Sequence, residues 1–110
     1  MTRQDKIIFN KILKGGATLS SGGYPCYFKT GYQVSKQDMF TTKQPEEALK
    51  LVKSLINKIE GYIGIWVDTD DTIYIDISIN IKNLQEAKKF GKQLKQISIY
   101  DWASNNCIYL

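Results

Sequence analysis

The chain has 110 residues and a mass of 12.6 kDa, with 43% hydrophobic and 24% charged residues, so we expect a single globular domain over residues 1–110. It contains no histidine, which excludes Ser-His-Asp and Cys-His catalysis and histidine-containing zinc sites. Cys26 and Cys107 are the only thiols, and two thiolates do not complete a zinc site. We therefore expect no catalytic residues, no bound metal, no cofactor and no enzymatic activity.

The net charge of +4 is unevenly distributed along the chain. Residues 1–60 carry an excess of positive charge, whereas residues 61–80 carry four aspartates and no lysine. Residues 81–100 are again rich in lysine. This pattern predicts basic helices and an acidic hairpin end, a dipolar surface that can steer a charged partner. Lysines that only solvate helix faces are the alternative explanation.

Capping and turn residues predict the secondary structure of residues 1–44. Thr2–Lys14 is predicted as a helix, because Thr2 and Asp5 have capping-box spacing. Ala17–Ser20 and Cys26–Ser35 are predicted as strands, with Ala17–Ser20 paired against Tyr27–Val34 in a hairpin. Residues 37–44 are polar and are expected to form a loop.

Pro45 begins the most strongly periodic segment, an amphipathic helix expected to continue until Gly61. Tyr62–Asp68 and Thr72–Ile79 then alternate as the two strands of a hairpin. The isoleucines of these strands, with Val67, share one face. The opposite face carries Tyr62, Gly64, Trp66, Tyr74, Asp76 and Ser78.

The last elements are a helix starting at Asn83 and a terminal hairpin of Ile97–Trp102 and Cys107–Leu110. The predicted order is α-ββ-α-ββ-α-ββ. We therefore expect an α+β fold, an antiparallel sheet with helices packed on one face as a two-layer sandwich. The domain would comprise an N-terminal helix (1–14) and a sheet-and-helix core (15–110). No segment has the composition of a signal peptide or membrane span, so we expect a cytoplasmic protein with no membrane partner.

The aromatic side chains of the second sheet face are the strongest candidates for a contact surface. They are Tyr62, Trp66, Tyr74 and Trp102. Exposed Trp and Tyr in such a group are typical of protein interfaces. Two alternatives remain: the face is covered or mediates homodimer formation, or the rings stack on unpaired bases of a nucleic acid.

The acidic and basic residues have several interpretations. Asp68, Asp70, Asp71 and Asp76 lack the glycine and glutamate of a calcium loop, and Asp70 and Asp71 are typical turn residues. A small metal-dependent enzyme would use Asp68, Asp76 and Asp101. The lysines Lys88, Lys89 and Lys92 could contact a phosphate backbone, which would make the chain a nucleic-acid-associated accessory factor.

Strand and turn segments within residues 15–110 also carry a resemblance. They are Gly61-Tyr-Ile-Gly-Ile-Trp-Val-Asp68, Ile73-Tyr-Ile-Asp-Ile-Ser78, Gln96-Ile-Ser-Ile-Tyr-Asp-Trp102 and Cys107-Ile-Tyr-Leu110. This pattern resembles small accessory proteins of phages and conjugative elements, whose genes are rich in inhibitors of host defences, anti-CRISPR proteins among them. The resemblance covers most of the chain and implies no catalytic residue.

Taken with the residues, this resemblance implies a non-catalytic binding protein of a mobile genetic element in the bacterial host cytoplasm. Its partner would be a host protein such as a CRISPR–Cas effector, blocked by protein–protein contact. The expected contact is made by Tyr62, Trp66, Tyr74 and Trp102. Asp68, Asp70, Asp71 and Asp76 would mimic phosphates toward a basic groove of that partner.

Overall fold

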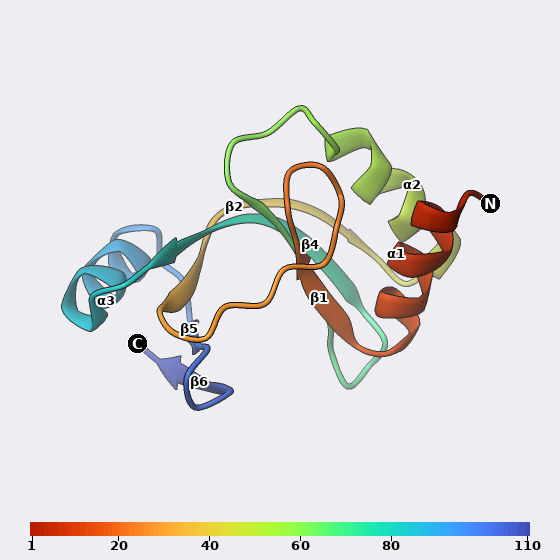
Figure 1. The fold of residues 1–110 in the computed structure, drawn as a ribbon. Coiled ribbons are helices and arrows are strands. Elements are labelled where there is room, and N and C mark those ends of the chain that lie inside the picture. Colours follow the sequence, from red (N-terminus) through yellow and green to blue (C-terminus); the bar gives the residue numbers. More distant parts are fainter.

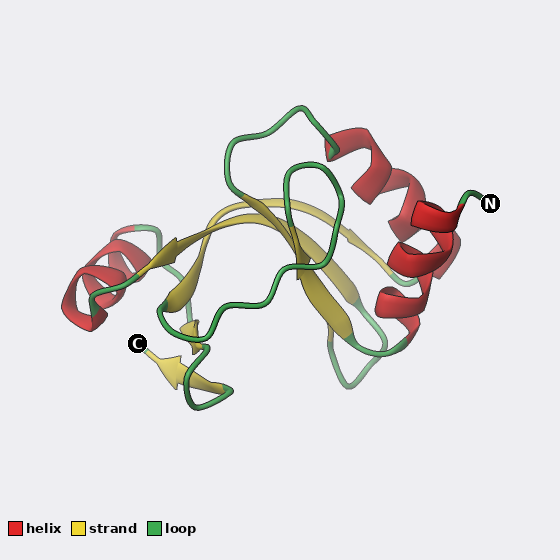
Figure 2. Cartoon of the chain, in the orientation of Figure 1, coloured by secondary structure: helices red, strands yellow, loops and turns green.

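The computed structural model describes residues 1–110 as an α+β fold with one six-stranded antiparallel sheet and three helices (Figures 1 and 2). In chain order the elements are α1 (Arg3–Leu13), β1 (Gly16–Leu19), β2 (Tyr32–Thr42), α2 (Pro45–Leu55), β3 (Tyr62–Val67), β4 (Ile73–Ile81), α3 (Leu84–Gln93), β5 (Ser98–Asp101) and β6 (Asn106–Tyr109). The α+β class and the antiparallel sheet agree with the sequence prediction.

The strands are ordered β1-β3-β4-β2-β5-β6 across the sheet. The long strands β2 and β4 pair in the middle and curl strongly. Helices α1 and α2 lie together at one end of this curled sheet, and α3 lies at the other end (Figure 1). The helices therefore form two separate groups along the sheet, and a simple flat two-layer sandwich does not describe the molecule.

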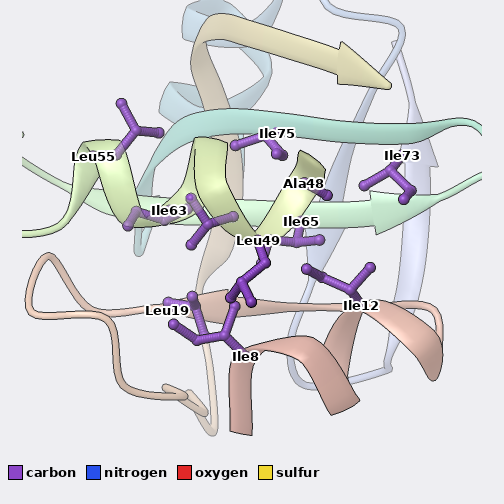
Figure 3. Packing of buried hydrophobic residues seen from close by; sticks show 11 residues of the cluster. Ile8, Ile12, Leu19, Ala48, Leu49, Leu55, Ile63, Ile65, Ile73 and Ile75 are labelled. Carbon is purple, nitrogen blue, oxygen red and sulfur yellow. The ribbon is translucent and has the colours of Figure 1, made fainter. Parts of the chain in front are cut away.

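The main hydrophobic core lies between α1, α2 and the strands β1, β3 and β4 (Figure 3). It contains Ile8 and Ile12 of α1 and Val52 of α2, together with four isoleucines of β3 and β4: Ile63, Ile65, Ile73 and Ile75. Ile63 and Ile75 are at most 1% exposed. Each such side chain contributes roughly 1.5–3 kcal/mol of burial free energy. The predicted isoleucine face is therefore confirmed as core.

A second, smaller core joins α3 to the other end of the sheet. Val34, Ala87 and Ile99 are buried there, and partly buried side chains of β2, β4 and β6 surround them. A Cβ added at Gly91 of α3 would lie 2.7 Å from Cδ1 of Leu110 and 3.2 Å from Cγ2 of Ile99, so a larger side chain there would require these side chains to shift. The small size of this core makes the α3 end depend on few contacts.

The predicted helix starts are confirmed. Thr2 and Asp5 form a reciprocal capping box at α1, and the Asn83 side chain accepts a hydrogen bond from the amide of Glu86 at α3. Pro45 begins α2, but this helix ends at Leu55 rather than near Gly61. The amide of Asn57 instead donates to the carbonyl of Ser21, and Asn57 takes a left-handed conformation that stops the helix.

The hairpin predicted between Ala17–Ser20 and Tyr27–Val34 is wrong. Strand β1 pairs with β3, and β2 pairs with β4 and β5. After β1 the chain turns back only briefly, where Leu19 bridges Pro25 and the Cys26 amide donates to the Thr18 carbonyl. Residues 20–31 then form a loop that leads to the other side of the sheet (Figure 1).

Residues 37–44 were expected to be a loop, yet most of them belong to strand β2. The register of β2 against β4 shifts twice, between Ser35 and Gln37 and between Asp38 and Phe40. Each bulge adds a residue and breaks the simple alternation of polar and apolar side chains. The hydrophobic period that identifies a strand is lost in this segment for that reason.

Candidate functional site

A groove of about 1150 Å³ runs along the face of the sheet opposite the main core. Its floor is formed by residues of β2, β3 and β4, and its far end by β5 and β6. The rest of the lining comes from Lys11 of α1, residues 15–18 at β1, the loop residues Cys26 and Tyr27, and the chain after α3. The side chains of the predicted aromatic face that line it are Trp66, Tyr74 and Trp102.

Trp66 and Tyr74 form a stacked aromatic pair that lines this groove. They are paired across β3 and β4, and their rings stack with centroids 4.4 Å apart and planes 11° from parallel. Trp66 is 47% exposed although it is a large apolar side chain on a central hairpin. An exposed, rigid aromatic pair supplies contact area at low entropic cost, which is typical of interface anchors.

Tyr62 and Trp102 lie in a different environment from Trp66. The ring of Phe28, from the loop between β1 and β2, packs on both of them, with centroids 5.2 Å from Tyr62 and 5.5 Å from Trp102. Tyr100 packs edge-on against Trp102. The four predicted aromatics are therefore split. Trp66, Tyr74 and Trp102 line the groove, whereas Tyr62 does not, and Phe28 packs on both Tyr62 and Trp102.

A polar network fixes Trp102 further. Its indole N–H donates to Oε1 of Gln33, 3.0 Å away, and Nε2 of Gln33 donates to Oγ of Ser78 at 2.8 Å. Asn80 donates to the same Gln33 oxygen. The buried Gln33 side chain thus joins β2, β4 and the β5–β6 turn. This network holds one side of the groove in place.

Two carboxyl groups line the groove, the exposed Asp38 on β2 and the partly buried Asp76 on β4, and they pair in register. The Asp76 carboxyl lies over Gly64 of β3, where a Cβ atom would overlap its oxygen. Burial and, after it, the charge of Asp38 raise the pKa of Asp76 to about 7. Asp76 therefore changes charge near neutral pH.

The other predicted carboxylates lie in the β3–β4 turn and are held by turn contacts. Asp68 accepts a hydrogen bond from the amide of Thr69, and Asp70 accepts one from the amide of Thr72. The hydroxyl and amide of Thr72 hold the pKa of Asp70 below its usual range. Asp71 occupies the left-handed region at φ 66°. The acidic group is thus divided between this turn and Asp76 in the groove floor.

The residues proposed for metal chemistry are not brought together. Asp101 accepts hydrogen bonds from Ala103 and Ser104 in the β5–β6 turn, apart from Asp68 in the β3–β4 turn. The fold assembles no group of three or more Asp, Glu or Cys side chains suited to a metal ion. Both cysteines are free, and both line the groove.

The candidate nucleic-acid lysines lie on α3 and outside the groove. Lys89 and Lys92 are exposed and Lys88 is partly buried. None of the three lines the groove. A contact through these lysines would use a surface separate from the aromatic face.

Three residues of the site were missed by sequence reasoning. Phe28 and Gln33 were assigned to a strand without a role, and Asp38 was placed in a loop. The polar composition of residues 37–44 concealed the strand that brings Asp38 opposite Asp76. No local signal in the sequence predicts that pairing.

No helix of the chain combines the length and the apolar composition needed to cross a membrane. Comparison with protein-family models, with curated proteins and with solved structures gives no match.

Proposed function

We propose that the chain is a non-catalytic binding protein that holds a segment of a partner protein in the groove. The observation that carries this proposal is the exposed Trp66–Tyr74 stack in a groove of about 1150 Å³. Binding grooves are concave and partly apolar, with a few placed polar groups. The groove has these properties.

The partner class follows from the resemblance to accessory proteins of phages and conjugative elements. We propose a host defence protein, for example a CRISPR–Cas effector, that is inhibited by occupation of one of its functional surfaces. In this arrangement Trp66 and Tyr74 make the central contact. Asp68, Asp70 and Asp71, exposed or partly exposed at the end of the same hairpin, would lie toward a basic region of the partner.

The hydrophobic core also holds the groove residues in position. Side chains along β3 and β4 alternate between the core and the groove, so the core isoleucines fix the groove residues from behind. We propose that all three helices support the sheet from that core side, which would leave the groove side free for the partner. A rigid scaffold lowers the entropic cost of binding.

The test is affinity capture from a lysate of a bacterium that carries a CRISPR–Cas system, with nuclease present. The wild-type chain is compared with the double variant Trp66→Ala, Tyr74→Ala and with Tyr24→Ala. Tyr24 is a matched control, because it is 59% exposed and lies outside the groove.

We expect a stoichiometric protein partner that survives nuclease, is retained by Tyr24→Ala and is lost with the double variant. Thermal unfolding of the free variants shows whether they fold. Capture that is unchanged in a folded double variant would contradict the proposal. Partners that disappear with nuclease would instead favour a nucleic-acid factor acting through Lys88, Lys89 and Lys92.

A further inference from the structure

The groove floor contains negative charge without a cation from the chain itself. Asp38 and Asp76 face one another across β2 and β4. The ion pairs of the molecule are Lys43–Asp70 and Lys53–Asp5, and neither involves these carboxyls. The basic groups that line the same groove are Lys11 of α1 and Lys95 after α3, and both are farther than 4.0 Å from the two carboxyls. The two carboxyls therefore have no ion-pair partner within the fold.

The absence of a side chain at Gly64 provides the space that the Asp76 carboxyl occupies. Gly64 lies opposite Asp76, and a Cβ there would also lie 2.9 Å from Cγ of Asp76. Ser35 on β2 contributes a hydroxyl 3.4 Å from Oδ1 of Asp38. An apolar or amide side chain at position 76 would pack in the same volume without the electrostatic cost. The free carboxyl pair thus points to an external positive group.

An aromatic wall adjoins the carboxyl pair. On β3 and β4, the Gly64–Asp76 pair is followed two residues along by the stacked Trp66–Tyr74 pair, so both pairs project on the same face. A guanidinium is planar, forms paired hydrogen bonds to carboxylates and stacks on aromatic rings. An ammonium group matches only the charge. The geometry favours arginine over lysine for this reason.

Building on the proposed function, we infer that the partner segment in the groove presents an arginine side chain. Its guanidinium lies between the carboxyl groups of Asp38 and Asp76 and against the Trp66–Tyr74 stack. The partner is thus a protein with an exposed arginine in an extended segment, and the carboxyl pair selects that side chain.

The experiment is a titration of the full chain, followed by two-dimensional NMR, with the peptide acetyl-Ser-Val-Arg-Val-Ser-amide. A matched peptide with norleucine in place of arginine measures the contribution of the charge. We expect the arginine peptide to shift the amides of Gly64 and Asp76 and the indole of Trp66. It should bind about tenfold or more tightly than the norleucine peptide, which corresponds to one charge-assisted contact.

Two variants and a pH series complete the test. The double variant Asp38→Asn, Asp76→Asn should lose the preference for arginine, whereas Glu60→Gln, at an exposed position outside the groove, should keep it. Binding of the arginine peptide should strengthen about tenfold between pH 6 and pH 8 in the wild type, because Asp76 becomes ionised in that range.

Several results would overturn the inference. They are equal affinity for the two peptides, shifts confined to residues outside the groove, or no binding of either peptide. The same shifts produced by magnesium chloride alone would assign the pair to a metal ion instead. If capture of the partner needs Trp66 but not Asp38 and Asp76, the binding function stands and the arginine inference fails. If capture does not need Trp66, the binding function itself fails.

Discussion

The carboxyl of Asp76 is expected to make the stability of the free protein depend on pH. Its pKa rises from the ordinary 3.8 to about 7 in the folded chain, because the side chain is partly buried and lies near Asp38. The folded state therefore holds this proton more tightly than the unfolded chain does. The substitution Asp76→Asn keeps the shape of the side chain and removes the charge.

The sign and size of the effect follow from proton linkage. Below about pH 4 both states carry the proton, so the favourable contribution of the protonated group is fully present. As the pH rises toward 7 the unfolded chain ionises first, and the wild type loses stability until the folded carboxyl is also ionised. A shift of about three units at about 1.4 kcal/mol per unit gives a loss of about 4 kcal/mol. Asp76→Asn avoids this loss.

The assay is urea unfolding of the wild type and Asp76→Asn at a series of pH values. We expect the two proteins to have similar free energies of unfolding near pH 4, and the variant to be more stable by about 4 kcal/mol near pH 8.5. Asp71→Asn controls for the removal of one carboxylate from an exposed turn. A difference between wild type and Asp76→Asn that does not change with pH, or an equal gain in Asp71→Asn, would refute this reasoning. Asp38→Asn should move the midpoint of the wild-type transition to lower pH.

Two further substitutions test the backbone and the polar network of the site. Gly16→Ala should destabilise the fold by about 1–3 kcal/mol more than Gly15→Ala. Both glycines have positive φ, but only a Cβ at Gly16 meets the backbone of β3, and chemical unfolding of the two variants compares them directly. Gln33→Ala should cost about 1–3 kcal/mol, since it leaves Ser78 and the indole of Trp102 without their hydrogen bonds. Gln37→Ala, an exposed position on the same strand, should cost little, and equal losses at the two glutamines would contradict the role of the network.

The parts of the fold with a regular hydrophobic period were predictable from the sequence. The alternating isoleucines of β3 and β4 and the caps at Thr2 and Asn83 give local signals that the structure confirms. Each of these patterns involves only residues that are close together in the sequence. The helix starts and the core face of the central hairpin were therefore predicted correctly.

Strand pairing depends on contacts between residues far apart in the chain, and the sequence patterns did not predict these pairings. Strand β1 pairs with β3 after a gap of more than forty residues, although a nearby strand seemed available. The two bulges in β2 hide its alternation, so Asp38 could not be placed opposite Asp76. The packing of Phe28 on Trp102 was also not predictable, because Phe28 lies in a loop that no sequence pattern assigns to this position.

Stability and function make opposite demands on the groove. An ionised Asp76 lowers the stability of the free protein, and the exposed Trp66 ring leaves apolar surface in water. Natural sequences retain such unfavourable groups mainly where a ligand compensates for them. Both features lie on the same side of β3 and β4, and for this reason we propose the contact surface there rather than on α3.

The measurement that tests this account most directly is hydroxyl-radical footprinting of the chain alone and in complex with the captured partner. Aromatic side chains report their own exposure in this method, so the groove is read without mutation. The account predicts that Trp66 and Tyr74 are oxidised in the free chain and protected in the complex, while Tyr24 is oxidised equally in both. Oxidation of Trp66 that is unchanged by the partner, with protection elsewhere, would contradict the assignment of the groove as the binding surface.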